Sequence, residues 1–454
     1  MSRSLERVLS LRDLILLVIG AVIGSGIFIV PGRVLRDTDG RIGVALLVWL
    51  VAGVLSLLGA LTYGELSAAD PQSGGIYVYI RDAFGRMPAF LYGWTLLFMI
   101  AGGAVATLAV AFTSYLSQIV PVSGVVARLV SIAMIAVVMI INVRGTRQSA
   151  DVQNVTTVIK AGAILIMGAV LLFSGDGFQG AGAAMWPENW SGSVFSGVLL
   201  AMISVLWAYE GWQFVTFSAG EAKDPQRTFP RGIMVGTLAL ILLYCFANIA
   251  YIAALGPQRV AATDTVAADA VGALLGPVAG KLIAATILIS MFSAANSILL
   301  TTPRVYFAMA RDGIFFRKLA EVHPRFKTPA IAVIVQALWA MGLAATGTFN
   351  QLLTYVVFTG WIFYALGAAS IFVLRRTRPD IVRPFKVPGY PYTPALFVIA
   401  SAIIVINTLI TQPGLALVGL AFVLSGAPAY LIWRRFAGRD AGRVTRDEVA
   451  AGND

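Results

Sequence analysis

The stretches IGAVIGSGIFIVPG (19–32) and VLWAYEGWQFVTFSAGE (205–221) decide the fold of this sequence. The first holds three glycines and a serine within seven residues: Gly20, Gly24, Ser25 and Gly26. Glycine leaves helical geometry at little cost, and inside a bilayer the freed N–H and C=O groups need a partner other than lipid. Glycines also let two helices pack closely. The first stretch by itself therefore leaves an interrupted helix and a close helix contact both open.

The second stretch places Glu210 and Gly211 at a similar depth in another apolar segment. A carboxylate inside a membrane is costly and marks a functional site by default. The two stretches open two blocks of five predicted spans, 14–174 and 193–374. Interrupted helices at corresponding positions of two halves are typical of an inverted-repeat transporter. Because five is odd, the two halves would insert with opposite orientations.

The composition indicates a membrane protein. Of the 454 residues, 58% are hydrophobic and only 12% are charged, whereas a soluble domain has about one quarter charged residues. Residues 328–374 and 387–433 contain no charged side chain and no histidine, and each run is long enough for a pair of spanning helices. Barrel strands would alternate polar and apolar residues, and these runs are apolar throughout. The spans are therefore predicted to be helices.

We predict about twelve spans: 14–31, 42–64, 88–117, 122–142, 153–174, 193–218, 232–255, 272–302, 329–346, 351–374, 393–411 and 414–433. The predicted organisation is a cytoplasmic tail (1–13), two five-helix repeats (14–174 and 193–374), two further helices (393–433) and a second cytoplasmic tail (434–454). Residues 74–86 are expected to form an amphipathic helix at the cytoplasmic interface, and 255–281 a lid-like external segment.

The distribution of lysine and arginine predicts the orientation. Of the 33 such residues, 26 fall in the tails and loops on the side of both termini and six on the other side. Because cytoplasmic loops carry the excess of positive charge, both termini are expected to be cytoplasmic. This pattern also accounts for the net charge of +11, so nucleic-acid binding need not be invoked.

An interrupted helix suits a zwitterion. At a break, one half-helix presents free N–H groups with partial positive charge and the other presents free carbonyls with partial negative charge. The carboxylate of an α-amino acid suits the amides around Ser25, Gly26 and Ile27. Its ammonium suits carbonyls near Val22 and 207–210. Trp207 fits an aromatic gate over the site, and plain helix packing is the alternative.

Lys160 is the one basic residue deep within a predicted span. Two roles remain open for it: a proton carrier, or a fixed cation that holds neighbouring carbonyls. Only Lys160 and Glu210 lie deep, so the convergent titratable pairs of an enzyme are missing. With one cysteine and one histidine, a Cys/His metal site is not available, and no metal or other cofactor is expected.

Five stretches carry a resemblance to a known family: GAVIGSGIF (20–28), YGELSAADPQSGGIYVYIRDAFG (63–85), NVRGTRQSADVQNVTTVIK (142–160), LWAYEGWQFVTFSAGEAKDPQRTFPRGI (206–233) and SAANSILLTTPRVYFAMARDGIFFRKLAEVHPRFKTP (293–329). They run through the first nine predicted spans in order. The sequence resembles the amino acid–polyamine–organocation superfamily and, within it, the L-type branch with its bacterial serine/threonine and alanine/serine/cysteine exchangers.

The resemblance implies an all-α LeuT-like fold: a five-plus-five inverted repeat with discontinuous helices 1 and 6, plus two C-terminal helices. It implies sodium-independent exchange of neutral L-amino acids in a bacterial inner membrane. The implied substrate-binding residues are Gly24, Ser25 and Gly26 for the carboxylate, and Val22, Trp207, Ala208 and Glu210 for the amino group. Lys160 matches a lysine beside the sodium site of sodium-coupled relatives, and Ser293, Asn296 and Ser297 are expected to face it.

Two departures matter. Glu210 stands where this branch often has glycine or aspartate, and its carboxylate would favour cationic substrates if it faced the site. Lys160 and Glu210 together leave proton-coupled transport and transport of cationic amino acids or polyamines as alternatives, and an amino-acid sensor without transport is the alternative from another class. Eukaryotic relatives carry a cysteine that links a glycoprotein partner near spans 3 and 4. None is present there, so no covalent heavy chain is expected.

Overall fold

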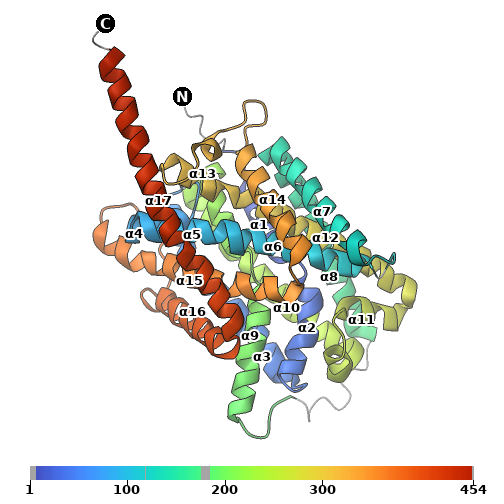
Figure 1. The fold of residues 1–454 in the computed structure, drawn as a ribbon. Helices are drawn as coiled ribbons and strands as arrows, with labels where there is room; N and C mark the ends of the chain where they lie inside the picture. The colour runs from blue at the N-terminus through green and yellow to red at the C-terminus, as the bar shows by residue number, and fades with distance from the viewer. Residues whose placement is uncertain (1–6, 118, 175–184, 452–454) are drawn as a thin grey trace.

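The computed structural model describes residues 7–117, 119–174 and 185–451, and the regular secondary structure in these ranges is helical apart from one isolated bridge between Leu9 and Ala222. In chain order the helices are α1 (Leu11–Val22), α2 (Gly26–Asp37), α3 (Ile42–Ala69), α4 (Ile76–Phe84), α5 (Arg86–Thr95), a π-helical turn (Leu96–Ile100), α6 (Ala101–Leu116), α7 (Gly124–Arg144), α8 (Thr146–Ser174), α9 (Gly192–Ala208), a 3-10 segment (Trp212–Glu221), α10 (Pro225–Ala261), α11 (Val266–Leu275), α12 (Pro277–Thr301), α13 (Pro303–Arg311), a short 3-10 turn (Arg317–Ala320), α14 (Ala330–Thr346), α15 (Phe349–Thr377), α16 (Tyr392–Thr411) and α17 (Pro413–Ala451). Figure 1 shows them as one bundle, with both chain ends on the same side.

The helix beginnings follow local sequence signals. Ser10 and Asp13 form a capping box at α1, in which the Ser10 side chain accepts from the Asp13 N–H and the Asp13 carboxylate accepts from the Ser10 N–H. This arrangement satisfies two donors that a helix start leaves free. Proline occupies the first turn of α10, α12 and α13, where its missing N–H has no cost.

The described ranges contain ten helical segments long and apolar enough to cross a membrane, and α1 with α2, bent by 45° at their junction, forms an eleventh candidate. The predicted ninth span falls on α14, which is apolar but only 17 residues long. Every predicted span thus coincides with helix in the structure, and the all-helical membrane fold is confirmed. Twelve crossings and the five-plus-five repeat remain predictions.

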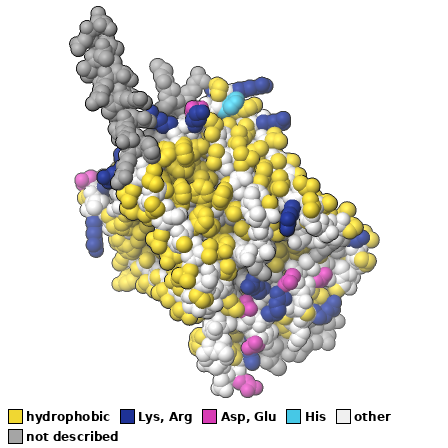
Figure 2. All heavy atoms as spheres, in the orientation of Figure 1, with side chains coloured by type: hydrophobic (Ala, Val, Ile, Leu, Met, Phe, Trp, Pro, Cys, Tyr) yellow, Lys and Arg dark blue, Asp and Glu magenta, His cyan; other side chains and the backbone are white. Residues whose placement is uncertain are grey.

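The outer surface agrees with a lipid environment. Figure 2 shows a broad band of hydrophobic side chains between two rims where charged side chains gather. The exposed fraction reaches 88% for Phe173, 74% for Ile410 and 70% for Ile166. A water-soluble monomer rarely exposes so much contiguous apolar surface, whereas lipid tails are as apolar as these side chains.

The helix predicted over 74–86 exists as α4, and its first half is buried in the bundle. The side chains from Ile76 to Ile80 are buried, and α4 packs against α5 and α15. The Tyr77 hydroxyl and Arg81 both donate to the Asp312 carboxylate, at 2.6 and 2.7 Å. The apolar face of this segment is therefore covered by protein, and its position at the cytoplasmic interface stays a prediction.

Candidate functional site

The first interruption separates α1 from α2 at residues 23–25. The Ile23 backbone is extended and ends α1, and α2 restarts at Gly26 with Ser25 as its N-cap residue. The Ser25 hydroxyl is buried and has no hydrogen-bond partner among the described residues. Since the first N–H groups of a helix have no acceptor within it, the amides of Gly26 and Ile27 point out of the start of α2. The predicted break is confirmed.

The second interruption lies between α9, which ends at Ala208, and the 3-10 segment that begins at Trp212. Gly211 sits in the break with φ at +128°, a conformation that glycine adopts without strain. A Cβ on Gly211 would lie 2.8 Å from the carbonyl atoms of Ala21, and a Cβ on Gly26 would lie 2.4 Å from the Cα of Ala208. The two interruptions are therefore in direct contact, and glycine is needed on both sides of that contact.

Tyr244 joins the two interruptions. Its hydroxyl lies 3.1 Å from the Val22 carbonyl oxygen and 3.1 Å from the Ala208 carbonyl oxygen, the last residues of α1 and α9. Its ring packs against Trp49 and Tyr209, with centroids 5.6 and 5.1 Å away. The carbonyls expected to receive a substrate ammonium thus already contact a hydroxyl from α10. The sequence shows only an apolar stretch with a tyrosine here, which is why Tyr244 was not predicted.

Lys160 is fully buried and its ammonium contacts the end of α1. Nζ donates to the carbonyl oxygens of Gly20 at 2.7 Å and Ile23 at 2.6 Å, and lies 3.5 Å from that of Ser290. The carbonyl end of a helix carries partial negative charge, so an ammonium is stabilised there. The contacts match the fixed-cation alternative, in which lysine holds the carbonyls freed by the break.

The three predicted α12 residues near Lys160 occupy a neighbouring position. Ser293 accepts from the Thr156 hydroxyl at 2.8 Å. Asn296 accepts from Asn142 at 2.9 Å and donates to the Gln153 side chain at 3.2 Å. The Ser297 hydroxyl is buried without a hydrogen-bond partner among the described residues.

Ser290, one turn earlier on α12, is the serine that reaches the break. Its hydroxyl lies 3.0 Å from the Ile23 carbonyl oxygen and 3.3 Å from that of Gly24. Lys160 from α8 and Ser290 from α12 thus contact the same carbonyl group of Ile23. The sequence places several serines on α12 at helical spacing, and nothing in their order distinguishes this one.

Glu210 is nearly buried, with 8% of its surface exposed. Its Oε1 accepts from the Gln213 side-chain amide and from the Tyr364 hydroxyl, each at 2.5 Å. Tyr364 belongs to α15, so this carboxylate connects the second interruption to the last helix of the predicted second repeat. Tyr63 on α3 in turn donates to the Tyr364 carbonyl oxygen at 2.8 Å.

A small cavity of about 20 Å³ lies between the two interruptions. Six of the eight predicted substrate-binding residues line it: Val22, Gly24, Ser25, Gly26, Trp207 and Glu210. The other two, Ile27 and Ala208, are buried beside it. The remaining walls are Ala21, Ala104, Leu108, Ala294 and Ile298. A water needs about 10–15 Å³, so this conformation has room for roughly one water and must widen to hold an amino acid.

The walls from α6 and α12 were not predicted. Ala104, Leu108, Ala294 and Ile298 are ordinary apolar residues in apolar helices, with no chemical feature that sets them apart in the sequence. They border the cavity only because α6 and α12 pack together beside the first interruption. Their small or aliphatic side chains give this side of the cavity an apolar surface.

Comparison with known proteins agrees with this geometry. Residues 9–430 match the family described as amino acid permease. The chain is 33% identical to the large neutral amino acids transporter small subunit 2 of Rattus norvegicus over 92% of its length and 78% of the relative's. It is 32% identical to the serine/threonine exchanger SteT of Bacillus subtilis (strain 168), covering 94% and 96% of the two chains.

A third relative, the human cystine/glutamate transporter, is 32% identical over 94% of this chain and 86% of its own. Each of these matches extends over nearly the whole chain, and the family match spans both interruptions and the helices that pack around them. The chain therefore belongs to the amino acid permease family, in the L-type branch of the amino acid–polyamine–organocation superfamily, and is a multi-pass membrane transporter of amino acids rather than an enzyme.

Proposed function

We propose that this protein exchanges neutral L-amino acids across the membrane by alternating access, without sodium. The observation that carries the proposal is the contact between the two interrupted helices, whose free ends border one cavity. The N–H groups at the start of α2 would bind the substrate carboxylate, and the carbonyls that end α1 and α9 would bind its ammonium. The apolar walls from α6 and α12 would receive a small neutral side chain.

Lys160 supports the absence of sodium coupling. Its ammonium contacts two carbonyl oxygens at the end of α1, at 2.6 and 2.7 Å. A bound cation at this position would satisfy the same carbonyls, and the lysine supplies that charge permanently. Carriage of a proton by Lys160 would require it to lose the charge that these contacts stabilise. Exchange driven by the substrates themselves is therefore the simpler mechanism.

The relatives support exchange. SteT is named as a serine/threonine exchanger and the rat protein as a transporter of large neutral amino acids. We carry exchange of neutral amino acids over to this chain as part of the proposal, together with twelve spans, a LeuT-like repeat and cytoplasmic termini. The absence of a covalently linked heavy chain belongs to the same proposal, because Cys245 in α10 is the only cysteine of the sequence.

Transport of cationic amino acids is the second candidate, and it rests on Glu210. This residue lines the cavity, so its carboxylate lies close enough to attract a positively charged side chain. Against this, two donors already bind Oε1, one of them from α15. A cationic substrate would have to compete with those hydrogen bonds, whereas a neutral substrate leaves them in place.

The test is exchange in proteoliposomes. Vesicles loaded with serine or alanine should take up labelled serine much faster than empty vesicles, equally with and without sodium. Absence of stimulation by internal substrate would refute exchange, and a requirement for sodium would refute the role given to Lys160. Uptake of labelled serine into vesicles loaded with arginine, measured across a pH series, distinguishes cationic or proton-coupled transport from the exchange of neutral amino acids. A sensor would bind amino acid in detergent yet show no uptake at all.

A further inference from the structure

A second cavity lies far from the interruptions, on the side of the bundle opposite the chain termini (Figure 1). The end of α10, α11 and the beginning of α12 form it, and its volume is about 740 Å³. It shares no residue with the small cavity between the interrupted helices. Substrate binding as proposed above therefore does not account for it.

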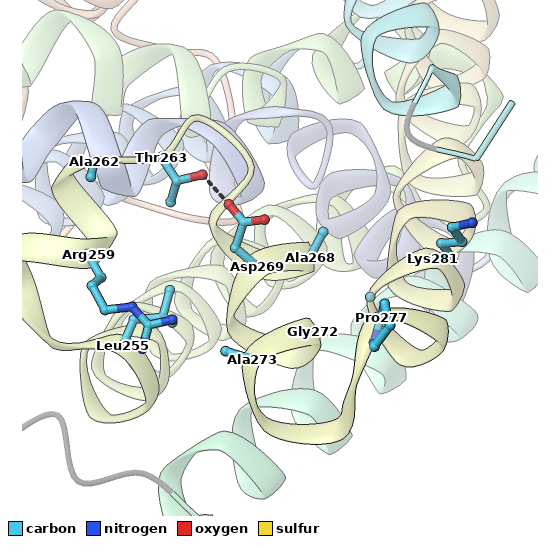
Figure 3. Close-up of a pocket in the computed structure, with 11 residues that line it drawn as sticks. Leu255, Arg259, Ala262, Thr263, Ala268, Asp269, Gly272, Ala273, Pro277 and Lys281 are labelled. Carbon is cyan, nitrogen blue, oxygen red and sulfur yellow. Dashed lines mark hydrogen bonds between the residues drawn. The ribbon is translucent and has the colours of Figure 1, made fainter. Parts of the chain in front are cut away.

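Two cations line this cavity, Arg259 near the end of α10 and Lys281 in the second turn of α12. Figure 3 shows them on either side of α11. Within the described part of the chain, neither side chain has a hydrogen-bond or ion-pair partner. By contrast, Arg36 on the same side of the bundle pairs with Asp264 at 2.6 Å. The two cations of the cavity are thus available to an external anion.

The one acidic residue in the cavity does not neutralise them. The Asp269 carboxylate accepts hydrogen bonds from the hydroxyls of Thr263 and Thr265, the second at 3.1 Å. These bonds hold it against its own loop, as the dashed line in Figure 3 shows for Thr263. The loops that the sequence predicts for this side of the bundle hold six of the 33 lysines and arginines. Two of those six at one cavity is a local concentration of positive charge.

Apolar side chains flank the cations. Val278 and Leu282 on α12 are 73% and 65% exposed, and Leu275 at the end of α11 is 58% exposed. Lys281 lies on the same face of α12 as Val278, three residues apart. This apolar surface would add no binding free energy for a free anion in water, whereas the acyl chains of a lipid would cover it.

We propose that this cavity binds the phosphate of an anionic phospholipid in the leaflet opposite the termini. Arg259 and Lys281 would contact the phosphate, and the acyl chains would lie along Val278 and Leu282. Such a lipid would tie α11 to α10 and α12 without touching the amino-acid site. The inference stands on this cavity alone and does not depend on which substrate is transported.

The test uses the full-length protein and native mass spectrometry after exchange into phosphatidylglycerol diluted in phosphatidylcholine. Wild type should retain phosphatidylglycerol in preference to phosphatidylcholine. Arg259→Gln and Lys281→Gln should each weaken that retention about fivefold, the contribution of one cation at a membrane surface. Arg128→Gln, an exposed cation of α7 outside the cavity, is the matched control and should retain the lipid as wild type does.

Equal retention by wild type and both cavity variants would overturn the proposal. An equal loss in Arg128→Gln would also overturn it, because surface charge in general would then suffice. Inorganic phosphate distinguishes the two sources of the anion. If it displaces the lipid as well as added phosphatidylglycerol does, the cavity binds free anions and the role of the acyl chains is wrong. Both cations are exposed, so the variants should fold, and unchanged melting temperatures in phosphatidylcholine verify this.

Discussion

Gly26→Ala tests the contact between the two interrupted helices. A Cβ at this position would lie 2.4 Å from the Cα of Ala208, whereas ordinary contacts begin at 3.4 Å. The backbones of α2 and α9 must therefore separate by about 1 Å, a change that side-chain rotation cannot relieve because the nearest atom is backbone. Overpacking of this kind costs about 1–3 kcal/mol.

Because both helices form the proposed site, that cost should appear in substrate binding. A loss of about 1–3 kcal/mol corresponds to a roughly 5- to 150-fold rise in the substrate concentration for half-maximal exchange. Trans-stimulated uptake of labelled serine into loaded proteoliposomes measures it, with the amount of folded protein determined on the same vesicles. Gly162→Ala on α8 is the matched control, since its Cβ would meet nothing within 4 Å.

Gly24→Ala adds an intermediate case between this control and Gly26→Ala. A Cβ on Gly24 would lie 3.0 Å from a terminal methyl of Leu108, which is the flexible end of a side chain and can move. Gly24→Ala should therefore fall between Gly162→Ala and Gly26→Ala in its effect. Wild-type exchange and wild-type thermal stability in Gly26→Ala would show that the two interruptions do not touch, and the reasoning from their contact would fail.

Four further substitutions address single contacts. Lys160→Met removes the ammonium that binds the Gly20 and Ile23 carbonyls and leaves Ile23 with the Ser290 hydroxyl alone. Loss of a buried donor costs about 1–3 kcal/mol, so exchange should fall about tenfold; wild-type rates would remove the fixed-cation role. Tyr244→Phe should weaken apparent affinity about 2- to 10-fold by losing one hydroxyl, whereas Tyr251→Phe, whose buried hydroxyl has no partner among the described residues, should not change it in the same uptake assay. Trp207→Ala should lower turnover more than the amount of folded protein on immunoblots; equal losses would indicate plain packing. Glu221→Gln breaks a buried ion pair and should lower stability by about 3–5 kcal/mol, measured as a fall in melting temperature.

The sequence predicted the helices and both interruptions because each rests on a local signal. A long run of apolar residues predicts a membrane-spanning helix. A glycine cluster or a carboxylate in the middle of such a run predicts that the helix is interrupted there. Lys160 could be singled out for the same reason, as a cation in an apolar segment. These features need no knowledge of which helices are neighbours.

The missed residues are those whose role depends on packing. Tyr244 is one of several tyrosines in apolar segments, and it matters because α10 passes the ends of α1 and α9. Ser290 differs from Ser293 only in facing the break rather than α8. The same limit applies to α4, whose amphipathic pattern predicts a covered face without showing that α15 covers it. Periodicity indicates that a face is covered without indicating what covers it.

The contacts on the side of the termini show how the two interrupted helices are held together. The Leu9 N–H donates to the Glu221 carbonyl oxygen at 3.0 Å and its carbonyl accepts from the Lys223 N–H at 2.8 Å, which couples the start of α1 to the end of the 3-10 segment.

Two ion pairs connect this coupled unit to the surrounding helices. Asp13 pairs with Arg147 on α8 at 3.1 Å, and the Glu221 carboxylate pairs with Arg304 on α13 at 2.7 Å. The two half-helices on this side can therefore move as one body, because they are bonded to each other, but only after both ion pairs separate. Since the Glu221–Arg304 pair is fully buried, its separation requires water or another partner to reach it. We therefore expect the larger electrostatic barrier to oppose the opening of the protein toward the termini. Separation of the two interrupted helices within the site should meet a smaller one.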